Sequence, residues 1–197
     1  MSGASDLPRE IAEAGVGVAR LLRYDPRWPE AFDPSASGFL RSFLGPILGL
    51  PFVVIVAAMI TGVPGDGHVI DPRALWAAGL SQVMNMIAFP VIVGALARPL
   101  EIGAGYGAFI VVVNWASLFV NLAVTAATAL LLLGVFQVFG FVWLALFGVS
   151  LFVVWRAARE TLSPEIGPAL MMVVLWVGLG VATDRLGQLL TGAPAAG

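Results

Sequence analysis

The residues from Ile102 to Trp155 read IGAGYGAFIVVVNWASLFVNLAVTAATALLLLGVFQVFGFVWLALFGVSLFVVW, without one charged side chain. As a single helix these residues would extend for about 81 Å, whereas the hydrocarbon core of a bilayer is about 30 Å thick. The stretch must therefore cross the membrane and fold back once. We predict the turn at Gly134–Gly140, because it has a Gly at each end and holds the only Gln of the stretch. This turn gives spans at about 106–133 and 139–156.

Three further uncharged runs are long enough to cross a bilayer. We expect them to form spans at about 43–61, 74–97 and 167–183, the last ending at Asp184 and Arg185. Backbone groups in lipid must be hydrogen-bonded within their own segment, so the spans are helices. The predicted fold class is all-α: a polytopic membrane protein with a bundle of five transmembrane helices over residues 39–190 and a short tail over 191–197.

The composition supports a membrane protein and excludes several functions. The chain is 59% hydrophobic and 11% charged, with a mean hydropathy of +0.96, whereas soluble domains carry about 25% charged residues. The net charge of −2 gives no basic field for nucleic acid. The chain has no Cys, which excludes disulfides and thiolate sites. No apolar stretch near the start suggests a cleavable signal peptide, so we expect the first span to remain in the membrane.

The distribution of arginine predicts the orientation in the membrane. All ten basic residues are Arg. With the amino terminus inside, eight of them fall on cytoplasmic segments and two on the other side, which is the positive-inside asymmetry. The eight are Arg9, Arg20, Arg23, Arg27, Arg41, Arg98, Arg156 and Arg159, and the two are Arg73 and Arg185. The bias toward Arg, Ala, Gly and Val is typical of a GC-rich genome. We therefore expect a bacterial inner-membrane protein with a cytoplasmic amino terminus and a periplasmic carboxy terminus.

Residues 1–38 are predicted to be a cytoplasmic amphipathic helix followed by a Pro-rich connector. The helix covers about Pro8–Arg23 and is capped by Ser5 or Asp6. Its apolar residues recur at helical spacing, so one stripe lies either in the membrane interface or on the cytoplasmic ends of the bundle. The favoured placement is interfacial. The connector Tyr24–Ser37 is expected to be extended, with Trp28 and Phe32 anchored to headgroups and Ser37 capping the first span.

Polar side chains follow one face of the third predicted span and recur in the second. Asn114, Ser117, Asn121, Thr125 and Thr128 are spaced by three or four residues, and Ser81, Gln82 and Asn85 lie on the second span. Carboxamides are costly in hydrocarbon unless they find partners, so we expect the two faces to meet. The candidate polar face is Gln82, Asn85, Asn114, Ser117, Asn121 and Thr125. Two interpretations stay open, namely interhelical hydrogen bonding and a path for a small solute.

Two other features of the sequence are candidates for packing or binding. Gly45 and Gly49 form a small-residue pair that permits close approach of another helix. His68 lies near Asp66 and Asp71 in the first external loop, which we expect to be solvated, with a single metal site as the alternative. No cofactor is predicted.

The functional hypotheses follow from the lack of reactive groups in the spans. No Asp, Glu, Lys, Arg or His lies within a predicted span, and no credible catalytic set is present, so we expect no enzyme activity. The leading hypothesis is a scaffold or accessory subunit, whose partners are the lipid bilayer and another membrane protein or a second copy. The alternative is a facilitator or permease for an uncharged small solute along the polar face. An intramembrane enzyme is the third and weakest possibility.

The overall pattern resembles the Yip family of five-span membrane proteins over about residues 8–190. The features that carry the resemblance are the cytoplasmic amino-terminal segment, the Arg98-Pro99 end of the second span, the Gly-rich turn Gly103–Gly107 and the basic loop Arg156–Pro164. The Asp-Leu-Tyr/Trp-Gly-Pro signature of eukaryotic members is absent, and Leu44-Gly45-Pro46 retains only its end. The resemblance therefore implies a compact five-helix bundle without known enzymatic activity, and recruitment of small GTPases does not carry over.

Overall fold

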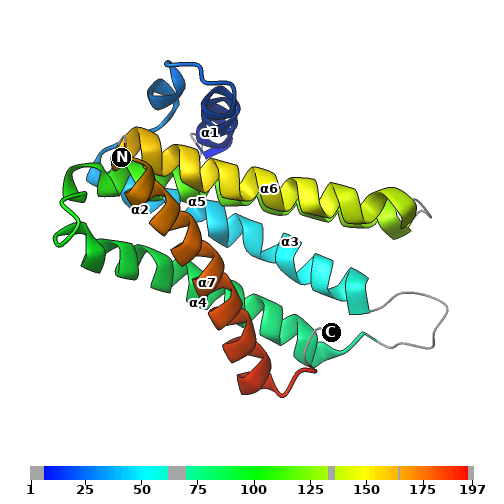
Figure 1. Ribbon diagram of the computed structural model, residues 1–197. Helices are drawn as coiled ribbons and strands as arrows, with labels where there is room; N and C mark the ends of the chain where they lie inside the picture. The colour runs from blue at the N-terminus through cyan, green and yellow to red at the C-terminus, as the bar shows by residue number, and fades with distance from the viewer. Residues whose placement is uncertain (1–6, 62–69, 133–135, 164, 195–197) are drawn as a thin grey trace.

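The computed structural model describes residues 7–61, 70–132, 136–163 and 165–194, with side chains for the same ranges except 131–140. Within these ranges the chain is helical and contains no strand (Figure 1). Five of the helices are long and apolar enough to cross a membrane. The predicted fold class is therefore confirmed, and the chain is a multi-pass α-helical membrane protein.

The elements follow one another along the chain with short connections. They are α1 (Leu7–Leu22), the 3₁₀ turn η1 (Trp28–Ala31), α2 (Ala36–Ser42), α3 (Leu44–Thr61), α4 (Pro72–Ala97), the 3₁₀ turn η2 (Gly103–Gly105), α5 (Tyr106–Leu132), α6 (Phe136–Thr161) and α7 (Ile166–Thr191). Helices α2 and α3 together form the first span, and α4 to α7 form the others. The sequence placed each span at the right point of the chain, with errors at the ends.

The last two spans are longer than predicted. Helix α6 already begins at Phe136, so the predicted turn Gly134–Gly140 is wrong in its second half, and residues 133–135 lie outside the described residues. Helix α7 does not end at Asp184 and Arg185 but continues to Thr191, where Gly192 adopts a left-handed conformation with φ 67°. Gln188 donates a hydrogen bond to Asp184 (2.8 Å) and accepts one from Arg185 (3.3 Å). Charge therefore ends the lipid-soluble part of a helix without ending the helix.

The first span begins earlier than predicted and contains a break. Ser35, not Ser37, is the N-cap of α2, since its hydroxyl accepts a hydrogen bond from the Gly38 amide at 3.1 Å. The connector is not fully extended either, because η1 forms within it. Trp28 is 7% exposed and belongs to the main hydrophobic core, so the prediction that it anchors to headgroups is wrong.

The five spans close a ring. Helix α3 packs against α4 and α5, α4 packs against α7, and α6 packs against both α5 and α7. The order around the ring is therefore α3–α4–α7–α6–α5. In Figure 1, the end of α6 and the start of α7 lie close together at their short connection, and the two helices diverge from there. We call the end where α3, α5 and α7 begin the α1 end, because α1 lies beside it (Figure 1).

Helix α1 is docked on the outside of the ring against α5 and α6. Its apolar stripe is covered by protein, since Ala14 and Leu21 are fully buried and Val18 is 7% exposed. Ala14 packs near Trp115 of α5 in one cluster, and Val18 packs near Val153 of α6 in another. The sequence left two placements open for α1, and these contacts agree with docking on the bundle. A position at the level of the lipid interface remains a prediction.

The close approach predicted for Gly45 and Gly49 is present between α3 and α5. A Cβ atom on Gly45 would collide with the backbone carbonyl of Asn114. A Cβ atom on Gly49 would lie 2.7 Å from Nδ2 of Asn121. These two glycines therefore bring α3 directly onto the polar face of α5.

Candidate functional site

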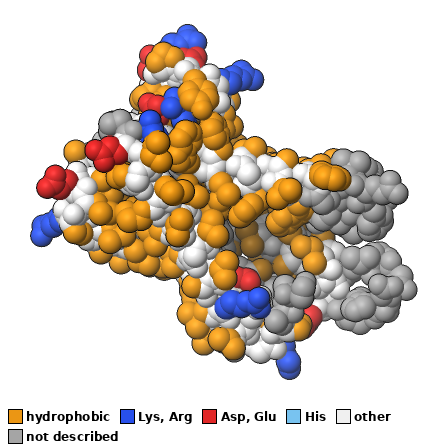
Figure 2. Space-filling model, viewed as in Figure 1, with side chains coloured by type: hydrophobic (Ala, Val, Ile, Leu, Met, Phe, Trp, Pro, Cys, Tyr) orange, Lys and Arg blue, Asp and Glu red, His pale blue; other side chains and the backbone are white. Residues whose placement is uncertain are grey.

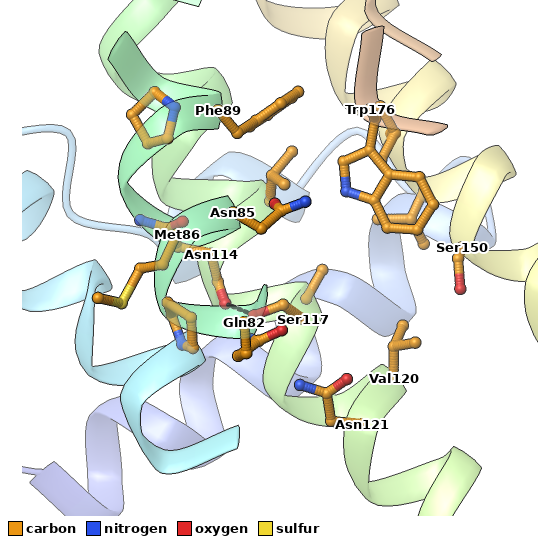
Figure 3. Close-up of a pocket in the computed structure, with 16 residues that line it drawn as sticks. Gln82, Asn85, Met86, Phe89, Asn114, Ser117, Val120, Asn121, Ser150 and Trp176 are labelled. Atoms are coloured by element: carbon orange, nitrogen blue, oxygen red, sulfur yellow. Dashed lines mark hydrogen bonds between the residues drawn. The ribbon is translucent and has the colours of Figure 1, made fainter. Parts of the chain in front are cut away.

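A cavity of about 140 Å³ lies in the middle of the ring. Every span contributes to its wall, with Pro46 from α3, Asn85 from α4, Asn121 from α5, Ser150 from α6 and Trp176 from α7. Figure 3 shows these polar side chains and the Trp176 indole around one space. A cavity of this volume has room for several water molecules or a small ligand.

The cavity lies at the middle depth of the spans. Asn85, Asn121 and Trp176 each stand at least ten residues from both ends of their helices. At 1.5 Å per residue this places them about 15 Å or more from either helix end. The polar groups of the cavity thus face the part of the bilayer where bulk water is absent, and they must find other partners.

One subset of the predicted polar face holds helices together. Asn114 Nδ2 donates a 3.0 Å hydrogen bond to Ser42 Oγ at the break between α2 and α3, and Ser42 Oγ donates to Phe39 O at 2.7 Å. Thr125 Oγ1 lies 3.3 Å from Phe52 O of α3 and 2.8 Å from Asn121 O of its own helix. These residues have the role of interhelical hydrogen bonding that the sequence suggested.

Other bonds of the polar residues stay within one helix or join different helices from those expected. Ser117 Oγ donates to Asn114 O at 2.7 Å, and Thr128 Oγ1 donates to Val124 O at 2.8 Å. Ser81 Oγ of α4 donates to Ala77 O at 2.7 Å and lies 3.0 Å from Thr183 O of α7. The described residues thus show no hydrogen bond between the polar faces of α4 and α5. The polar faces of the second and third spans share a cavity, and their interhelical hydrogen bonds go to α7, α2 and α3.

A second subset has no protein partner. Gln82, Asn85 and Asn121 line the cavity, and the described residues offer no hydrogen bond to any of the three carboxamides. Nδ2 of Asn121 is buried and unpaired within the same ranges. A Cβ atom on Gly180 would lie 3.9 Å from Nδ2 of Asn85, so this amide reaches toward α7. An unpaired amide in a low-dielectric site costs about 1–3 kcal/mol, which water or a ligand in the cavity would offset.

A more apolar hollow of about 250 Å³ adjoins the cavity. The two share Val120, Asn121, Ser150 and Trp176. The rest of the hollow is lined by Phe52, Val53, Val56, Val124, Trp143 and Phe147. Ser150 and Trp176 belong to this site although they are not part of the predicted polar face. The only signals in the sequence are a hydroxyl residue near the middle of α6 and a Trp far from the ends of its span.

The α1 end of the ring is sealed by tightly packed side chains. The rings of Phe89 and Phe109 lie 6.0 Å apart across α4 and α5, and Tyr106 Oη donates to Pro90 O at 3.0 Å. Val93 and Met172, which belong to the same cluster, have no exposed surface. The cavity is therefore separated from this end by a layer of packed apolar residues.

Most ion pairs in the described residues gather around α1 and the connector, and the pair of Arg156 with Glu160 lies near the end of α6. Arg41 contacts Glu10 Oε2 at 3.1 Å and Asp33 Oδ2 at 2.7 Å, which joins α1, the connector and α2. The backbone amide of Ser35, followed by its side chain and Arg41, holds the pKa of Asp33 below its ordinary value of 3.8. The Arg27 side chain and amide lower the pKa of Asp25 to about 2. The cavity wall carries no charged residue among those described.

Comparison of the chain with protein-family models, with curated proteins and with solved structures gives no match. The described residues contain no cluster of three or more His, Cys, Asp or Glu that could hold a metal ion, and His68 with Asp66 lies outside them. The fold and the site together define a class: a multi-pass α-helical membrane protein whose spans enclose an uncharged polar cavity at mid-depth.

Proposed function

We propose that the protein is a non-enzymatic membrane facilitator that binds an uncharged, hydrogen-bonding solute in the central cavity. The observation that carries this proposal is that Gln82, Asn85 and Asn121 line the cavity with carboxamides to which the described residues offer no hydrogen bond, and that Nδ2 of Asn121 is buried as well. Packing alone gives no reason for them, since Asn114 and Thr125 already join the helices. Carboxamides provide both donors and acceptors without charge, so a neutral solute satisfies them without the cost of burying an ion.

The absence of Cys from the chain allows a direct test of passage through the cavity. Ser150 lines both hollows, and its hydroxyl bonds only to Leu146 O of its own helix among the described partners, so Ser150→Cys is a mild change. Vesicles containing this variant should take up glycerol or urea faster than protein-free vesicles, and N-ethylmaleimide should abolish the difference. Ala145→Cys, on an exposed position of α6, is the matched control that the reagent should not inhibit. Uptake equal to that of protein-free vesicles would contradict the proposal.

A second candidate function is the scaffold or accessory subunit, favoured by the surface around α1. Helix α1 is fixed to the ring by buried apolar contacts and by the Arg41 ion pairs, while Val16 remains 49% exposed and Arg9 and Glu13 lie on the outer face. A rigid, charged platform of this kind suits a protein partner. Crosslinking in intact membranes from cysteines at Val16 should then recover one defined neighbour, and recovery of monomer alone would contradict this function.

The orientation and the family are also proposals. The arginine asymmetry supports a bacterial inner membrane with the α1 end in the cytoplasm and the carboxy terminus in the periplasm. A reporter that works only in the periplasm should therefore be active when it is fused after Gly197, and a reporter that works only in the cytoplasm should be inactive there. Membership of the Yip family remains a resemblance in the order of segments.

A further inference from the structure

The apolar hollow places the candidate site in contact with the surrounding lipid. Phe147 of α6 lines the hollow and is 43% exposed. Helices α6 and α7 diverge from their connection, and the surface is hollowed between the arm of α6 and the arm of α4 and α7 (Figures 1 and 2). The wall of the hollow is mostly valine and aromatic side chains, and it lies between membrane spans, where bulk water is absent. The opening therefore faces hydrocarbon.

We infer that the ligand of the central cavity is an uncharged single-chain amphiphile that enters from the bilayer between α6 and α7. Its hydroxyl or carbonyl headgroup would lie in the polar cavity, and its chain would lie in the hollow between Phe52, Trp143 and Phe147. This inference rests on the proposed binding role of the cavity and names the class of molecule that the cavity takes.

The headgroup chemistry follows from the unpaired groups. Nδ2 of Asn121 is a donor without a partner among the described residues, so the ligand needs an acceptor oxygen at that point. Asn121 stands where the cavity and the hollow join, because it lines both. The described lining carries no charge, so a phosphate or ammonium headgroup would be desolvated there without a counter-ion.

The chain follows from the shape and lining of the hollow. The hollow is larger than the polar cavity, about 250 Å³ against about 140 Å³, and its wall is mostly valine and aromatic side chains. A water-soluble solute would leave this apolar volume unfilled. A flexible alkyl chain fills it and exchanges contacts with lipid tails for contacts with protein, so the headgroup contacts decide which amphiphile is bound.

The test uses the full-length protein in nanodiscs and three photoreactive probes with the same 16-carbon chain. One probe ends in a hydroxyl group, one in a trimethylammonium group and one in a methyl group. The alcohol should label Phe147, Trp143 or Trp176 in a saturable manner, with at least tenfold more incorporation than either other probe. Unlabelled hexadecanol should compete.

Variants make the test specific. Val120→Phe, which fills the junction of the two hollows, should reduce saturable labelling more than tenfold. Asn121→Leu should weaken competition about threefold, the effect of one intramembrane hydrogen bond. Leu144→Phe on the exposed face of α6 is the control and should change nothing. Thermal melting of each variant confirms that it is folded.

Labelling confined to exposed positions such as Leu144, or equal labelling by all three probes, would overturn the inference. Uptake of glycerol through the Ser150→Cys protein without saturable labelling would overturn the inference of an amphiphilic ligand. It would leave the proposed facilitator function standing. Failure of both experiments would remove the binding role of the cavity altogether.

Discussion

The two halves of the helix ring differ in how their interiors are filled. At the α1 end, apolar side chains from four spans interlock around Phe89, Phe109 and Met172 and leave no exposed surface on Met172. At mid-depth the same helices surround a cavity with three carboxamides that have no protein partner among the described residues. Selection for stability alone would fill the interior of both halves with packed side chains. The difference supports the proposal that the packed half holds the ring together and the hollow half binds a ligand.

The largest effect should come from disrupting the close contact between α3 and α5. Gly45→Ala places a methyl group against the backbone carbonyl of Asn114, which cannot move aside as a side chain can. We expect a loss of about 1–3 kcal/mol in unfolding free energy, the usual cost of overpacking, measured by denaturation in mild detergent. Gly178→Ala is the matched control, since no atom lies within 4 Å of its added Cβ. An equal loss in both variants would contradict the close contact.

The next effect concerns the hydrogen bond that joins α5 to the break between α2 and α3. Asn114→Leu removes the 3.0 Å bond to Ser42 and should cost about 0.6–1.7 kcal/mol, the range for such bonds in membranes. A double-mutant cycle with Ser42→Ala should show a coupling energy of similar size. Strict additivity of the two substitutions would mean that this bond contributes nothing.

A smaller effect is expected where α1 is held by ion pairs. Arg41→Ala removes the contacts to Glu10 and Asp33, both at positions partly open to solvent, so the loss should be at most about 1 kcal/mol. Amide hydrogen exchange of α1 should then rise about two- to fivefold, with the ring unchanged. Arg9→Ala, which removes the exposed pair with Glu13, should have less effect. Exchange of α1 that is the same in both variants would show that apolar contacts alone hold it.

The smallest effect is a pH dependence confined to the α1 region. The pKa of Asp33 is below its ordinary value of 3.8 in the folded protein, so its contribution to stability is complete above that value and is lost as the pH falls through the lower folded pKa. After correction for the intrinsic pH dependence of amide exchange, the exchange rate of α2 should be constant between about pH 5 and 8. It should increase below about pH 4. Asp33→Asn should remove this acid sensitivity, and a variant that retains it would exclude Asp33 as the cause.

The sequence predicted the class of fold because the relevant physics is local. A charge-free run must dissolve in hydrocarbon, so each span could be placed from composition alone. The ends of the helices were less predictable. Gln188 bonds to Asp184 and Arg185 as α7 continues past these charged residues, and α7 then ends at its C-cap, Gly192. Burial of Trp28 depends on α1 docking against α5 and α6, a tertiary event that a Pro-rich connector does not reveal.

The candidate site was predictable only as a set of residues. Helical spacing placed Asn114 and Asn121 on one face, but it does not distinguish a carboxamide that bonds to Ser42 from one that faces a cavity. That distinction depends on the order of helices around the ring, in which α4 contacts α7 more extensively than its neighbour in sequence, α5. Trp176 and Ser150 enter the site for the same reason.

Gln82, Asn85 and Asn121 are proposed to serve a ligand and not the fold. The most direct measurement compares thermal stability and neutral-solute uptake in reconstituted protein for Asn121→Leu, Asn85→Leu and Gln82→Leu. We predict melting temperatures equal to or above that of the natural protein, because an unpaired amide is removed from the interior, together with at least a severalfold loss of uptake. A clear fall in melting temperature with uptake unchanged would show that these carboxamides are structural and that the cavity is not kept for a ligand.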